Sequence, residues 1–77
     1  MQQETRKPAL YWHGTIPAGC DCCGIGIHSE FVDGATIHGP WANLHPTCHL
    51  RIGRGIGPGL GQRYRKQDDG RWMKVEG

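Results

Sequence analysis

Two short stretches of the chain each carry a pair of soft metal ligands three positions apart. Cys20 and Cys23 form a Cys-x-x-Cys pair, and His45 and Cys48 form a His-x-x-Cys pair after an interval of twenty-one residues. Zinc favours a tetrahedral set of four Cys and His side chains, and paired ligands at this spacing are typical of its sites. The sequence therefore predicts one structural zinc ion bound by Cys20, Cys23, His45 and Cys48.

This ligand set has alternatives within the same two stretches. Cys22 is a substitute for Cys20 or Cys23, and His49 is a substitute for His45. We prefer Cys23 because the glycine that follows it suits the tight turn of a zinc knuckle, and Cys20 because it completes the two-residue spacing. The competing interpretations of the cysteines are an iron–sulfur site, redox-active thiols, or incidental cysteines in a reduced protein.

The size of the chain makes a bound metal a useful supplement to its core. A chain of 77 residues forms one domain at most, and so small a domain usually needs a metal, disulfides or a partner. Its hydrophobic fraction is 36%, and its 13 glycines each lose much backbone entropy on folding. We expect a flexible arm over residues 1–9 and a single zinc-binding domain over residues 10–77.

The cysteines also bear on the compartment. The first residues contain no apolar core of a secretory signal, and no stretch approaches the length of a membrane span. We therefore expect a reduced, cytoplasmic protein without a membrane partner. In that compartment, clustered Cys and His indicate a metal more often than disulfides.

The remaining pattern predicts a small zinc-stabilised α+β fold, built from β-hairpins and one short helix. Asp33-Gly34 is a two-residue turn signal within a β-prone stretch, and Pro46 suits the first turn of a helix. Trp41 is expected to cover the metal site or the core. The expected elements are a strand over 10–16, a hairpin over 27–37, a helix over 46–52 ended by Gly53, and strands over 62–67 and 71–75.

Five of the nine basic residues lie in a stretch without any acidic residue, between His49 and Gln67. Part of this stretch, 53–61, alternates glycine with other residues. A flexible basic segment suits contact with a phosphate backbone, and an aromatic side chain within it can stack on a base. The alternative is that this stretch is a solvated linker or contacts a protein. The predicted DNA- or RNA-binding residues are Arg51, Arg54, Arg63, Tyr64, Arg65 and Lys66.

Two other functions are considered. Exposed tryptophans, Trp12, Trp41 and Trp72, would serve an adaptor that binds a host protein. The segment from Asn43 to His49 is similar to the zinc-bearing segment of HNH nucleases, with His38 and His49 as candidate ligands of a catalytic ion. Only four residues separate His38 from Asn43, which is short for that motif. We therefore expect no enzyme and assign no catalytic residue.

Four motifs resemble a group of small phage and prophage zinc-finger-like proteins. They are Cys-Asp-x-Cys-Gly, Asp-Gly-Ala-Thr, Gly-Pro-Trp-Ala-Asn-Leu and Gly-x-Gly-x-Gly-Gln-x-Tyr, and the resemblance runs from Cys20 to Gly77. In that group the third ligand is commonly Cys, where this chain has His45, and Cys22 falls at a variable position. The resemblance implies a phage origin and a treble-clef or zinc-ribbon-like fold, but little about activity.

Overall fold

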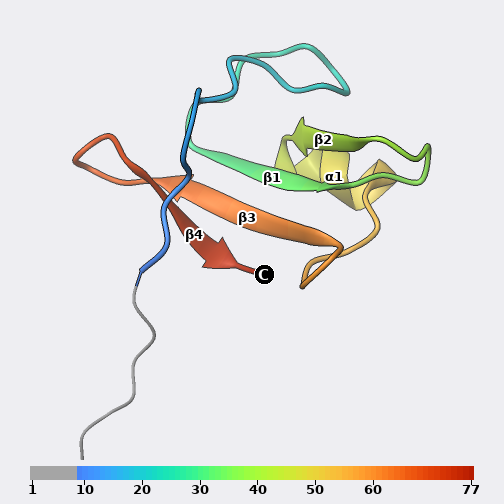
Figure 1. Ribbon diagram of the computed structural model, residues 1–77. Helices are drawn as coiled ribbons and strands as arrows, with labels where there is room; N and C mark the ends of the chain where they lie inside the picture. Colours follow the sequence, from blue (N-terminus) through green and yellow to red (C-terminus); the bar gives the residue numbers. More distant parts are fainter. Residues whose placement is uncertain (1–8) are drawn as a thin grey trace, which may run out of the picture.

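The computed structural model describes residues 9–77 and shows one antiparallel sheet with a short helix against it (Figure 1). The strand order in the sheet is β2-β1-β3-β4, and α1 contacts β1 and β2. The predicted α+β class is confirmed, whereas the predicted arm lies outside the described residues apart from exposed Ala9. The elements are β1 (Glu30–Ala35), β2 (Trp41–Leu44), α1 (Pro46–Ile52), β3 (Gly61–Lys66) and β4 (Trp72–Glu76).

The helix has the bounds that the sequence predicted. Pro46 occupies its first turn, where a missing N–H group costs nothing. The helix ends at Gly53, whose N–H group donates to the His49 carbonyl at 2.7 Å. Gly53 is extended there, with φ −82°, so a left-handed cap is not the reason for the glycine. The reason is space, because a Cβ atom at Gly53 would overlap the imidazole ring of His49.

The predicted turn at Asp33-Gly34 is wrong. Strand β1 runs straight through both residues, and each pairs with β2 on one side and β3 on the other. The chain turns later, over 37–40, to enter β2. A Cβ atom at Gly34 would lie 2.9 Å from the Leu60 carbonyl oxygen, so this glycine permits a close backbone approach. A turn glycine and a close-packing glycine look alike in a sequence, which explains the error.

The stretch predicted as a strand over 10–16 contributes only an isolated bridge. Tyr11 pairs with Met73, the Trp12 N–H group donates to the Trp72 carbonyl at 2.8 Å, and the Lys74 N–H group donates to Leu10 at 2.7 Å. This stretch therefore covers the outer edge of β4 without extending the sheet. The two C-terminal strands and the turn between them agree with the sequence prediction.

An aromatic group forms the centre of the core. The Phe31 ring has no exposed surface and lies within 5.3 Å of three other rings, stacked on Tyr64, edge-on to Trp12 and tilted against Trp72. Such pairs add to the stabilisation from buried area. Trp41, expected to cover the metal site or the core, is instead 47% exposed.

Replacing Phe31 with alanine tests this core. We expect Phe31→Ala to lower the free energy of unfolding by about 3–5 kcal/mol, because the cavity loses contacts with three aromatic rings. Chemical denaturation followed by circular dichroism measures this change. Leu50→Ala is the control, since Leu50 is 84% exposed and its loss should change the free energy by less than about 0.5 kcal/mol. Equal effects of the two substitutions would contradict the assigned core.

Candidate metal centre

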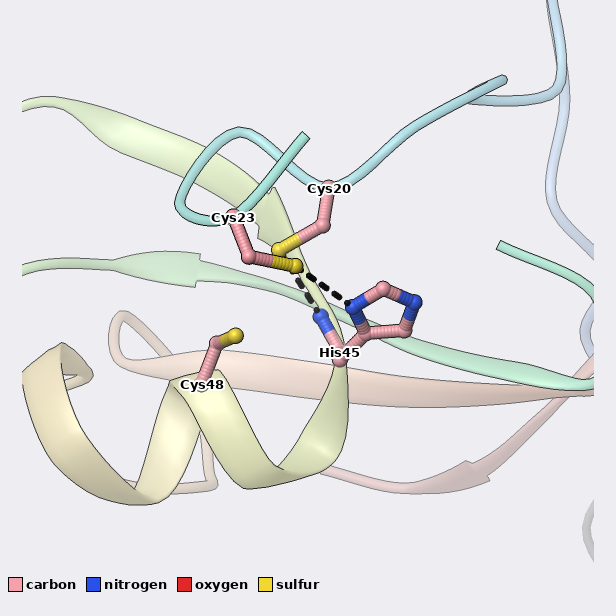
Figure 2. Close-up of side chains that lie close together, drawn as sticks. All are labelled: Cys20, Cys23, His45 and Cys48. Carbon is pink, nitrogen blue, oxygen red and sulfur yellow. Dashed lines mark hydrogen bonds between the residues drawn. The ribbon is translucent and has the colours of Figure 1, made fainter. Parts of the chain in front are cut away.

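Cys20, Cys23, His45 and Cys48 gather at one point, as Figure 2 shows. Their four ligand atoms all lie within 4.8 Å of one another. Ligands of a tetrahedral zinc site, with Zn–S bonds of about 2.3 Å, stand roughly 3.8 Å apart. The arrangement therefore fits one metal ion held by three sulfur atoms and one nitrogen atom.

The first two ligands come from a tight turn before β1. The Gly24 N–H group donates to the Cys20 carbonyl at 2.8 Å, and Gly24 adopts φ +77°, a conformation that favours glycine. The Cys22 N–H group points at the Cys20 sulfur at 3.4 Å. Backbone N–H groups directed at sulfur are what a zinc knuckle provides, because they stabilise the charged thiolate.

The other two ligands come from the start of α1. His45 immediately precedes the helix and Cys48 lies in its first turn. The His45 Nε2 atom lies 2.8 Å from the Gly26 carbonyl oxygen, which can only accept a hydrogen bond, so Nε2 carries the proton. The Nδ1 atom is then free to bind a metal, and it lies 3.3 Å from the Cys23 sulfur (Figure 2).

The thiols differ strongly in their tendency to ionise. Burial raises the pKa of Cys20, but hydrogen bonds from the backbone N–H groups of Cys23, His45 and Cys22 outweigh it and lower the pKa to about 6. Burial raises the pKa of Cys48 to about 12, helped by the neighbouring Cys20 and Cys23. Because crowded thiols resist ionising together, the cluster favours a bound divalent cation that compensates their charge.

The imidazole of His45 is held in place by its environment. Its pKa is raised, chiefly because the Gly26 carbonyl accepts a hydrogen bond from the ring and also because Cys23 lies beside it. The same carbonyl fixes the orientation of the ring. A metal ligand whose second nitrogen is fixed in this way needs little reorganisation on binding.

The structure decides between the alternatives that the spacing left open. Cys22 is exposed and lies outside the four-residue group. His49 is buried, and its Nε2 atom lies 3.1 Å from the Gly55 carbonyl oxygen. His38, the partner of His49 in the nuclease hypothesis, lies exposed in the turn over 37–40. Within residues 9–77 no second group of three metal-ligating side chains forms.

A clamp between Asp21 and Asn43 joins the knuckle to the sheet. The Asp21 N–H group donates to the Asn43 carbonyl at 2.9 Å, and the Asn43 N–H group donates to the Asp21 Oδ2 atom at 2.8 Å. Asn43 also donates from Nδ2 to the Asp33 carboxylate at 3.0 Å. Because His45 lies two residues beyond Asn43, the clamp sets the knuckle against the second ligand pair. No local sequence signal pairs Asp21 with Asn43, so the clamp could not be predicted from the sequence.

The residues predicted to contact nucleic acid lie in different surroundings and do not form one surface. Arg63 pairs with Glu76 at 2.8 Å and Arg65 pairs with Glu30 at 2.9 Å. Tyr64, between them on β3, faces the opposite side of the sheet and stacks on Phe31. The basic stretch contains no acidic residue in the sequence, but two of its arginines form ion pairs with acidic residues of other strands. The remaining members of the predicted set, Arg51, Arg54 and Lys66, are exposed.

Comparisons of the chain with models of known protein families, with curated proteins and with solved structures found no match. The resemblance to small phage proteins therefore stays a prediction from the sequence. In the part of the chain that the structure describes, none of the helical segments has the length and apolar character needed to cross a bilayer.

The candidate metal centre predicts that replacing Cys22 leaves metal retention intact, whereas replacing a cysteine of the site does not. Wild-type protein should carry about one metal ion per chain by elemental analysis, and a chelator should unfold it. Cys48→Ser should abolish metal retention, because serine is a poor ligand for a soft-metal site. Cys22→Ser is the matched control and should keep the metal and the fold. Loss of metal from Cys22→Ser, with retention in Cys48→Ser, would exclude this ligand set.

The clamp predicts an effect on metal affinity without loss of a ligand. Asp21→Ala removes the acceptor for the Asn43 N–H group, and we expect metal affinity to fall by about tenfold. Asp21→Asn keeps an oxygen that can accept the same hydrogen bond and should bind metal nearly as well as wild type. Competition with a chromogenic chelator measures both affinities. An unchanged affinity in Asp21→Ala would show that the clamp has no part in metal binding.

Proposed function

We propose that the chain is a treble-clef module held together by a structural zinc ion. The order of its parts supports this: a Cys-x-x-Cys knuckle, then the β1–β2 hairpin, then a helix whose N-cap residue and first turn supply the last two ligands. Four protein ligands leave no open coordination position, so the ion would serve the fold and not catalysis. Elemental analysis tests its identity, since zinc without iron is expected and iron would favour a cluster.

We further propose that the module is a small accessory protein of phage type, acting in the cytoplasm of a bacterial host and binding nucleic acid. The supporting observation is that Arg51 and Arg54 are exposed and that no carboxylate among residues 9–77 forms an ion pair with either. Both flank the end of α1, where the chain enters its glycine-rich segment. Unpaired cations beside accessible backbone suit phosphate contact.

The paired arginines have a smaller part in this proposal. Arg63 and Arg65 are already neutralised by Glu76 and Glu30, so a phosphate would have to compete with these carboxylates. Tyr64 packs in the core, which leaves its ring little freedom to stack on a base. The proposed interface therefore centres on Arg51 and Arg54, with exposed Lys66 as a further contact.

Salt-titrated binding tests this proposal. The wild-type affinity for a labelled single-stranded oligonucleotide, measured by anisotropy, should fall steeply with salt concentration. Replacing both Arg51 and Arg54 with glutamine should weaken binding and reduce the slope of log K against log salt by about 1–2. Arg71→Gln is the control, because Arg71 already pairs with Asp69 at 3.0 Å. Binding that is absent at low salt, or that both variants reduce equally, would contradict the proposal.

A further inference from the structure

Trp41 is the tryptophan that this fold leaves most exposed. It begins β2, the strand at the free edge of the sheet, and 47% of its surface is accessible. Trp72 is buried and Trp12 is partly buried against the core. Tryptophan is among the residues that contribute most to protein interfaces, because one side chain supplies a large and rigid contact area. An exposed indole beside an apolar hollow therefore marks a contact surface.

Such a hollow lies next to Trp41. It has a volume of about 270 Å³ and lies between β2, the turn that precedes it and the last residue of α1. Leu44, Ile52 and Pro40 form its apolar walls together with Trp41, and Asp21 lines it from the knuckle. Ile37, which is 60% exposed, is joined to Ile52 by a backbone hydrogen bond of 2.8 Å. The hollow thus offers space for an apolar side chain.

This hollow forms a groove beside Trp41, and the backbone next to the groove is open to an extended chain. Ala35 faces Trp41 across the strand pair, but its N–H group donates to Leu60 and its carbonyl accepts from Arg54. Because backbone groups alternate in direction along an antiparallel pair, the N–H and C=O groups of Trp41 point away from β1, off the free edge. The next such position, Asn43, is already covered by Asp21. One pair of backbone groups is therefore available for pairing.

The charges around Trp41 indicate what such a chain carries. Asp21 lines the groove, and Asp33 lies on the same face of the sheet as Trp41. Burial raises the pKa of the Asp33 carboxyl, and hydrogen bonds from the Trp41 and Asn43 side chains offset part of that rise. Two carboxylates attract a cation and repel phosphate groups. One basic side chain, the exposed His38 of the preceding turn, also lines the groove. Arg54 does not line it, and its backbone N–H group donates to the Ala35 carbonyl.

We propose that this surface binds an extended peptide segment of a partner protein that carries lysine or arginine beside apolar residues. An apolar side chain fills the groove between Leu44 and Ile52, the peptide backbone pairs with Trp41, and the cation lies over the indole near the two carboxylates. This inference does not depend on nucleic-acid binding through Arg51 and Arg54. A nucleic-acid strand is the competing occupant of the same groove.

Amide spectra of labelled, metal-loaded protein test the proposal. The probes are a short peptide of alternating valine and lysine, the matched peptide with glutamate in place of lysine, and a short single-stranded oligonucleotide. The valine–lysine peptide should shift the backbone and indole N–H signals of Trp41 and the signal of Asp21. The valine–glutamate peptide should not. If the oligonucleotide shifts Trp41 and the peptide does not, nucleic acid occupies the groove and the proposal is wrong.

Variants separate the aromatic contribution from the charge. Trp41→Ala should weaken binding of the valine–lysine peptide by about tenfold, and Asp21→Asn by several-fold, because it removes the charge and keeps the clamp. If Asp21→Asn loses its metal, Asp33→Asn replaces it as the test of charge. Leu50→Ala, exposed and outside the groove, should bind as wild type. Equal affinity of wild type and Trp41→Ala, with both folded and metal-loaded, would overturn the proposal.

Discussion

The meeting of three thiols and one imidazole is the constraint on which the rest of the structure depends. The two ligand pairs lie on either side of the β1–β2 hairpin, so bringing them together fixes the knuckle, the hairpin and the start of α1 at once. Two of the ligands, Cys20 and Cys48, also belong to the buried cluster that contains Phe31 and Leu44. A metal ion bound at this cluster would therefore couple its binding to core packing, which is consistent with the small size of the chain.

The clamp between Asp21 and Asn43 extends this constraint into the sheet. It saturates the backbone of Asn43 on the free edge of β2, while the stretch around Trp12 covers the opposite edge at β4. Small sheets need such protection, because unpaired edge groups invite association with other chains. What remains open lies at Trp41, and this is where the groove and the two carboxylates lie. The contacts that secure the two edges of the sheet thus leave the backbone of Trp41 as the open position on β2.

The charges follow a similar division. Glu30 and Glu76 neutralise arginines on β3, so that segment has a structural role beside any binding role. Arg51 and Arg54 lie outside these pairs, at the end of α1. Two carboxylates, by contrast, lie close to Trp41: Asp21 lines the same groove, and Asp33 is on the same face of the sheet.

The sequence by itself determined the features that depend on neighbouring residues. The spacing of the ligand pairs predicted that Cys20, Cys23, His45 and Cys48 gather at one point. Pro46 predicted the start of α1, and the turn before β4 was predicted too. Each of these features reflects local geometry. The tertiary structure decided what depends on distant contacts. It excluded Cys22 and His49 from the site and showed Gly34 to be a point of close approach within a strand.

The tertiary structure also brings Glu30 to Arg65 and Glu76 to Arg63, and it leaves Trp41 exposed. None of these contacts has a local signature. Glu30 meets Arg65 because β1 pairs with β3, and Glu76 meets Arg63 because β3 pairs with β4.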